Sequence, residues 1–205
     1  MTDFPLVRAR TALINVDLQN CFVEGSEVSA PDGPVVLDRV NRFAGACRRA
    51  RILVVHTRFV LHPDGSNAGV LAEIAPPVKA GILNDGSRSA AFCPGLAIEA
   101  DDLVLEKPRF GAFYHTELET ILRARGIDSV MISGLMSNVC CETTAREAMM
   151  RDFHVFLLAD GTATGAVGGL SAAELHRSTL ATLRSLFAEV LTIEEMTRKI
   201  ERAGT

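Results

Sequence analysis

Short apolar runs rich in β-branched residues alternate along this chain with segments of helical periodicity, and this alternation constrains the fold more than any other feature. Parallel strands joined by right-handed helical crossovers produce such a pattern. We therefore predict an α/β fold of three layers, a Rossmann-like, doubly wound, six-stranded parallel sheet in a single domain spanning residues 1–205. The expected strands are 11–17, 51–56, 102–106, 128–133, 153–159 and 189–192, and the expected helices are 34–51, 117–125, 138–150, 171–187 and a short one from 194.

Two segments carry local signals beyond this alternation. Ser171 and Glu174 have the spacing of a capping box, which predicts that a helix begins at residue 171. Residues 57–100 are rich in Gly, Pro, Asn and Asp and have weak periodicity, so we expect a long excursion from the sheet with room for one short helix. Long ordered loops often carry specificity.

Composition and charge exclude several classes of protein. With 205 residues, 48% of them hydrophobic, the chain can bury a full core. Its formal net charge of -4 leaves no basic field that would attract nucleic acid or an anionic membrane, so we expect neither partner. Apolar runs are too short to span a membrane and the N-terminal residues do not resemble a signal peptide, which predicts a cytoplasmic protein.

The segment around Cys140 and Cys141 has the strongest chemical signal. An apolar strand runs through Gly134 into a helix that begins at this cysteine pair. The unpaired N–H groups of a helix N-terminus favour negative charge, so a thiol there is expected to be stabilised as the nucleophilic thiolate. The alternative is that both cysteines are small buried residues of the core. The chain has five cysteines without the paired spacings of a zinc site, which predicts reduced thiols.

Doubly wound sheets bind ligands outside the carboxyl ends of their strands, and three chemically distinct groups are expected at that edge. Asp17 ends the first strand, Lys107 follows the strand at 102–106, and Cys140 follows the strand at 128–133. Each could have a structural role, as a turn cap, a solvated charge or a core thiol respectively. Their joint placement favours nucleophilic catalysis.

These residues lie in motifs that resemble those of the isochorismatase-like cysteine hydrolases. The sequence VDLQN at 16–20 resembles the first motif of this family, KPRFGAF at 107–113 its lysine motif and GLMSNVC at 134–140 its nucleophile motif. The three occur in the family's order, and the similarity extends to AREA at 145–148 and LADGT at 158–162. The resemblance covers nearly the whole chain and implies a six-stranded parallel sheet.

The resemblance assigns a role to each catalytic candidate. It implies that Cys140 is the nucleophile, that Cys141 is a packing residue, and that Asp17 acts as general base and acid while Lys107 orients Asp17. It also implies a cis peptide between Leu135 and Met136, which would place the Met136 and Cys140 N–H groups together as an oxyanion hole. The implied reaction is hydrolysis of a small amide, ureido or carbamoyl group through a thioester acyl-enzyme, with release of ammonia or carbamate and without a cofactor.

A metal is not expected. Nicotinamidases of this family carry an Asp-x-His…His cluster after the second strand, whereas the corresponding stretch here has only His56 and His62, with Phe59 and Leu61 where ligands would be needed. Two histidines make a poor site. We therefore predict that the protein is not a metal-containing nicotinamidase and that His62 is a loop residue near the rim of the pocket.

The segment 107–126 most resembles the ureidoacrylate amidohydrolases, and biuret, maleamate and N-carbamoylsarcosine hydrolases are also similar. Because many of their substrates carry a carboxylate, an arginine or amide side chain is expected to face the pocket. The candidate substrate-binding residues are Gln19, Asn20, Arg58 and Asn138, with Phe22, Phe110 and Tyr114 as walls. A homo-dimer or homo-tetramer is expected from the resemblance. The alternatives are a vinyl-ether hydrolase of the isochorismatase type, which usually lacks this cysteine, a nicotinamidase-like deamidase, and a non-catalytic binding protein.

Overall fold

The computed structural model describes residues 3–203, whose strands form one parallel sheet in the order β3-β2-β1-β4-β5-β6. The first strand, β1, thus lies in the middle of the sheet. The next two strands, β2 and β3, follow on one side of β1, and the chain then crosses back so that β4, β5 and β6 follow on the other side. The switch in direction falls between β1 and β4, where a doubly wound fold binds its ligand. The strands are β1 (Thr11–Val16), β2 (Leu53–Phe59), β3 (Leu103–Lys107), β4 (Ser129–Leu135), β5 (His154–Ala163) and β6 (Glu189–Leu191).

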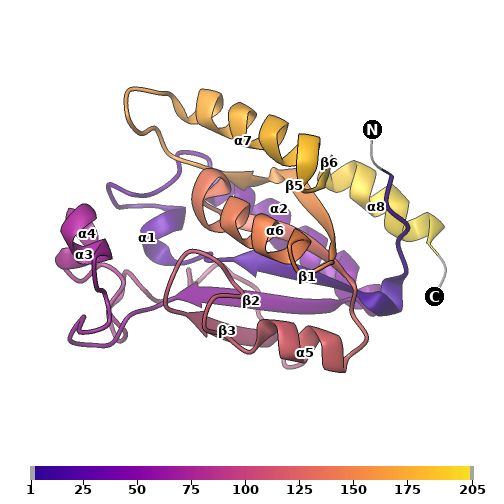
Figure 1. Cartoon of the computed structure of the whole chain (residues 1–205), viewed down its shortest axis with the longest axis horizontal. Helices are drawn as coiled ribbons and strands as arrows, with labels where there is room; N and C mark the ends of the chain where they lie inside the picture. The colour runs from indigo at the N-terminus through magenta and orange to yellow at the C-terminus, as the bar shows by residue number, and fades with distance from the viewer. Residues whose placement is uncertain (1–2, 204–205) are drawn as a thin grey trace.

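Helices cover both faces of the sheet (Figure 1). One face carries α2 (Gly33–Arg49) and α8 (Ile193–Arg202), and the other carries α5 (Leu118–Ala124), α6 (Glu142–Met149) and α7 (Ala172–Leu186). All six residues of β1 and all seven of β4 are buried, because these central strands are covered on both sides. The remaining elements are short: η1 (Arg8–Arg10), α1 (Asn20–Val23), α3 (Leu71–Ile74), α4 (Pro76–Lys79) and the π-helical turn η2 (Ser137–Cys141).

The predicted fold class is confirmed, and the differences lie at the ends of elements and in the loops. The capping box at Ser171 and Glu174 opens α7 as expected. The excursion at 57–100 contains two short helices where one was expected, and α1 and η1 were not predicted, because segments of three or four residues are too short to show a helical period. Strand β5 continues to Ala163, past a register shift in its pairing with β4. No helix among residues 3–203 is long and apolar enough to cross a membrane.

The carboxyl ends of β1 and β4 approach each other very closely at Gly134. This residue pairs with Val16 and has a φ of 111°, a conformation that favours glycine. A Cβ atom at position 134 would lie 2.0 Å from the Val16 carbonyl oxygen. Only glycine therefore lets β4 pass this point, and the close passage brings the turn after β4 next to Asp17.

Replacing Gly134 by alanine is expected to destabilise the fold by more than about 3 kcal/mol, because the new methyl group overlaps fixed backbone. Gly126→Ala is the matched control, since Gly126 also has a positive φ, of 68°, but has no atom within 4 Å of its virtual Cβ. The control is expected to lose only about 1–2 kcal/mol. Urea unfolding of the two variants measures the difference, and equal losses would show that the contact with Val16 is unimportant.

Candidate active site

Asp17 is held at the end of β1 by the neighbouring strand β2. Its φ of 51° turns the chain sharply out of the strand toward α1. Its backbone N–H donates to the Thr57 carbonyl oxygen at 3.2 Å, and the Thr57 hydroxyl donates to Asp17 Oδ1 at 2.7 Å. Both Asp17 and Thr57 are completely buried. The carboxylate therefore has a fixed position and little contact with solvent.

Lys107, the last residue of β3, supplies the charge that balances Asp17. Its Nζ lies 2.7 Å from Asp17 Oδ2, in an ion pair whose two side chains are inaccessible to solvent. The same Nζ donates to the carbonyl oxygens of Arg109 and Phe110, each at 2.9 Å. It also lies 4.6 Å from the centroid of the Phe59 ring. All three ammonium protons are thus engaged within the protein.

The loop after Lys107 is fixed by α6, and this explains how its carbonyl oxygens stay directed at the ammonium. The Ala112 N–H donates to Thr144 Oγ1 and the Phe113 N–H to Glu147 Oε2, both at 3.1 Å. Gly111 passes so close that a Cβ there would lie 2.1 Å from the Glu147 carboxylate. The AREA motif at 145–148, which contains Glu147, therefore supports the lysine.

Cys140 lies in η2, which connects β4 to α6. The peptide bond between Leu135 and Met136 just before it is cis, as the family resemblance implied. The Cys140 thiol lies close enough to the Asp17 carboxyl group for each to affect the pKa of the other, and the Met136 backbone lowers the pKa of the thiol. Cys141 points elsewhere, with its Sγ 3.9 Å from the Ser133 carbonyl oxygen, among residues of the core. The structure thus brings together Asp17, Lys107 and Cys140, as their positions at the sheet edge predicted.

Burial dominates the electrostatics of the three groups. It raises the pKa of the Asp17 carboxyl group, and the Lys107 ammonium only partly offsets this. Burial alone would lower the pKa of Lys107, but the charges of Asp17 and Cys140 outweigh it and raise that pKa. The pKa of the Cys140 thiol lies well above its usual range, because burial and the Asp17 charge outweigh Lys107. The direction of this pKa shift is opposite to the one expected for a thiol stabilised as a thiolate at a helix N-terminus.

An apolar cavity of about 220 Å³ reaches Cys140 and Met136. Phe22 and Phe110 are among its walls, in agreement with the prediction. Neither Asp17 nor Lys107 lines it, so both lie behind the thiol. The other lining residues come from the segment after α1, from β2, from α3, α4 and the residues beside them, and from η2: Val28, Phe59, Leu71, Ala75, Pro77, Val78, Ile82, Leu83 and Val139.

Two predicted substrate-binding residues have structural roles instead. The Gln19 amide group donates to the carbonyl oxygens of Phe59 and Ala90 and accepts from the Phe59 N–H, at 2.7–2.9 Å, which holds the excursion against β1. Arg58 pairs with the carboxylates of Asp85 and Glu106, away from the cavity. Backbone and charge partners distant in sequence therefore already engage the polar groups of both residues.

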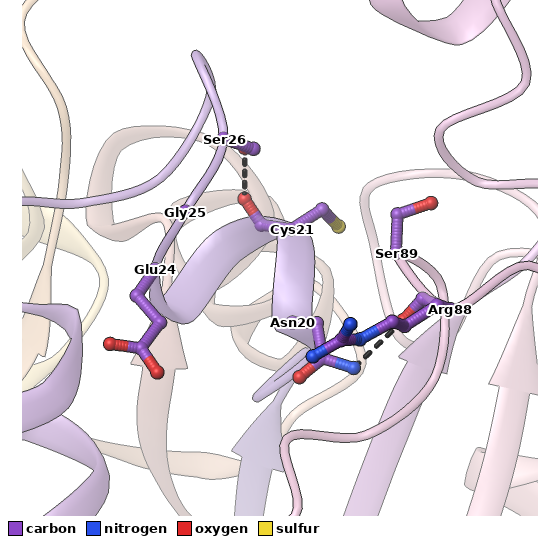
Figure 2. A pocket seen from close by; sticks show the side chains of 7 residues that line it. All are labelled: Asn20, Cys21, Glu24, Gly25, Ser26, Arg88 and Ser89. Carbon is purple, nitrogen blue, oxygen red and sulfur yellow. Dashed lines mark hydrogen bonds between the residues drawn. The ribbon is translucent and has the colours of Figure 1, made fainter.

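Asn20, Tyr114 and Asn138 are also outside the residues that line the cavity. Figure 2 shows Asn20 in a separate hollow at α1, where its side chain donates to the Arg88 carbonyl oxygen at 2.7 Å. Tyr114 is exposed and packs on His115. Asn138 accepts a hydrogen bond of 2.5 Å from Thr164 Oγ1. An arginine or amide side chain was expected to face the pocket. Among residues 3–203, no such side chain lines this cavity.

His56 and His62 do not converge. His56 is buried on the opposite face of the sheet, where its Nε2 lies 3.1 Å from Asp102 Oδ2. His62 lies in the excursion with its Nδ1 3.1 Å from Ser66 Oγ and borders a separate small pocket. No group of three His, Cys, Asp or Glu side chains able to hold a metal occurs in the described part of the chain.

Sequence reasoning missed two contacts that shape the site, that of Thr57 with Asp17 and that of His176 with Ser137. Thr57 could have been found, because it directly follows the second predicted strand and so falls at the carboxyl edge. His176 of α7 carried no signal. Its Nδ1 lies 3.0 Å from the hydroxyl of Ser137, the buried first residue of η2, and its Nε2 lies 3.0 Å from the Ala159 carbonyl oxygen. The imidazole thus connects α7 and β5 to the nucleophile turn.

Asp17, Lys107 and Cys140 are thus buried together at the carboxyl edge of a doubly wound parallel sheet, an arrangement that can support nucleophilic chemistry. The chain belongs to the isochorismatase family, since the model of the Isochorismatase domain matches residues 11–195.

Individual relatives agree with this family assignment. The ureidoacrylate amidohydrolase RutB of Methylorubrum extorquens is 35% identical over 173 residues, which cover 74% of this chain and 69% of that protein. Nicotinamidase 3 of Arabidopsis thaliana is 32% identical over 92% of this chain and 88% of its own length. The crystal structure of a cysteine hydrolase from Pseudomonas syringae superposes with a TM-score of 0.91 at 32% identity, covering 98% of this chain and 97% of that one.

Alkylation of Cys140 by iodoacetamide is expected to be slow at pH 7 and to accelerate without a plateau up to at least pH 9. A raised folded-state pKa keeps the thiol protonated until the pH exceeds the ordinary thiol value of about 8.5. Peptide mapping by mass spectrometry gives the rate at Cys140, with Cys140→Ala identifying its peptide. A plateau below pH 8 would show a thiolate in the resting site.

The contact between His176 and Ser137 is expected to give a coupling free energy of about 0.5–1.5 kcal/mol in a double-mutant cycle. Urea unfolding of His176→Ala, Ser137→Ala and the double variant measures it. Each substitution should cost more stability in the unsubstituted protein than in the protein that already carries the other substitution. Strict additivity would show that the hydrogen bond does not tie α7 to the nucleophile turn.

Proposed function

We propose that this protein hydrolyses a small carboxamide, ureido or carbamoyl group with Cys140 as nucleophile and without a metal. The observation that carries the proposal is the buried contact of the Cys140 thiol with the Asp17–Lys107 ion pair at the end of an apolar cavity. The amidohydrolase and nicotinamidase among the relatives support C–N bond hydrolysis. The presence of a cysteine at position 140 favours this chemistry over vinyl-ether hydrolysis.

The first half of the proposed reaction acylates the cysteine. Asp17 takes the thiol proton, for which its raised pKa makes it a stronger base than an exposed aspartate. The sulfur attacks the carbonyl carbon, and the backbone N–H groups of Met136 and Cys140 hold the developing oxyanion. The C–N bond then breaks, Asp17 gives its proton to the departing nitrogen, and ammonia or an amine leaves a thioester.

Hydrolysis of the thioester completes the cycle. Asp17 takes a proton from a water molecule, whose oxygen attacks the thioester carbonyl. The C–S bond then breaks to release the acid, and Asp17 returns the proton to the sulfur, which restores the thiol. Lys107 has no free proton for the substrate, since Asp17, Arg109 and Phe110 engage all three. Its role in the proposed reaction is to keep the carboxylate in place and to balance its charge.

Cys140→Ala is expected to lower kcat/KM for amide hydrolysis by at least about 10⁴-fold, because the attacking atom is lost. Cys141→Ala is the matched control, being the adjacent buried thiol that packs against the sheet. It should lose far less. Ammonia release from a panel of small amides measures both variants, and circular dichroism checks that each is folded. Equal losses in the two variants, or full activity of Cys140→Ala, would contradict the proposal.

A further inference from the structure

Within residues 3–203, no charged or hydrogen-bonding side chain other than the Cys140 thiol lines the cavity. Its thirteen lining residues are three phenylalanines, nine other apolar residues and Cys140. Phe59 and Phe110 meet edge to face, with ring centroids 5.7 Å apart, and form an aromatic corner of the cavity. The volume of about 220 Å³ is smaller than the ~300–1,000 Å³ typical of drug-sized ligands. The space therefore suits a compact hydrocarbon group.

The cations closest in sequence to the site are already engaged. Lys107 uses its three protons inside the protein. The Arg109 guanidinium donates to the carbonyl oxygens of Pro108 and Asn67 and does not line the cavity. Arg58 is paired with Asp85 and Glu106. A carboxylate that entered the cavity would lose its water without gaining a partner, which is strongly unfavourable.

The polar requirements of an uncharged amide are much smaller. Its carbonyl oxygen would be accommodated by the backbone N–H groups of the proposed oxyanion hole, and its nitrogen is the atom that Asp17 protonates in the proposed reaction. Its acyl group needs only apolar contact. The Asp17–Lys107 pair is neutral as a whole, so it offers no net attraction to an anionic substrate.

We infer that the site takes uncharged carboxamides whose acyl group is a compact hydrocarbon, either branched aliphatic or a single aromatic ring, and that it discriminates against amides that carry a carboxylate. This inference rests on the proposed function for the reaction, and on the cavity alone for the choice of ligand. It separates this chain from a hydrolase of anionic ureido acids, although a ureidoacrylate amidohydrolase is among its relatives.

The test compares two amides of the same shape, 4-methylpentanamide and succinamate. The acyl chain ends in an isopropyl group in the first and in a carboxylate in the second. Calorimetric titration of the Cys140→Ser variant measures binding without acylation of the thiol. The neutral amide is expected to bind about a hundredfold more tightly or better, because the carboxylate has no partner. Equal or tighter binding of succinamate, or no binding of the neutral amide at millimolar concentration, would overturn the inference.

A charge introduced at the wall tests the cause of the discrimination. Val78 of α4 is only partly buried, so Val78→Arg can place a guanidinium at the cavity with its stem along the surface. Succinamate is expected to gain at least tenfold in affinity in this variant and not in Val78→Met, which adds similar length without charge. An unchanged affinity for succinamate in Val78→Arg would show that the missing cation is not the reason and would also overturn the inference.

Turnover by the unsubstituted protein separates this inference from the proposed function. Both hold if 4-methylpentanamide releases ammonia in a Cys140-dependent way and succinamate does so at least about a hundredfold more slowly in kcat/KM. If the binding preference is found but no amide is hydrolysed, the proposed function fails and the ligand class stands. Cys140-dependent turnover that favours succinamate leaves the proposed function intact and refutes the ligand class.

Discussion

The buried ion pair between Asp17 and Lys107 is the interaction on which the rest of the site depends. Two opposite charges without access to water are costly to hold unless their geometry and remaining hydrogen bonds are nearly complete. The fold supplies these from three places: Thr57 of β2, the carbonyl oxygens after β3, and the α6 residues that fix that loop. The pair is therefore a product of the whole carboxyl edge of the sheet rather than of two residues.

A second polar system crosses the same strands on the opposite face. Ser133 donates to Asn15, Asn15 contacts His56, and His56 meets an Asp102 carboxylate that is also held by Arg48 of α2. Asn15 alternates along β1 with Ile14 and Val16, and His56 lies between Val55 and Thr57 in β2, so the polar system faces away from the active site. Buried polar networks of this kind fix strand alignment, since a shift of one residue would leave several groups without partners. Strand register and site geometry are thus secured together.

The sequence alone was sufficient for the sheet, because buried parallel strands and amphipathic helices have distinct periods, and for the three central residues, because strand ends converge at one edge. It was insufficient where a side chain's role depends on a distant partner. The roles of Gln19 and Arg58 follow from segments about 30 to 70 residues away, which no local pattern reveals. The direction of the pKa shift of Cys140 also escaped the sequence, because the burial that raises this pKa comes from tertiary packing.

The apolar lining of the cavity has a consequence for the end of the proposed reaction as well as for its beginning. Hydrolysis converts an uncharged amide into an acid that is ionised at neutral pH, so the product acquires a charge that the surrounding phenylalanine and aliphatic side chains cannot solvate. The same cavity walls that bind the amide would therefore favour release of the acid. Such a site would bind the acid product weakly, so accumulation of the acid in the medium would inhibit the proposed reaction only weakly.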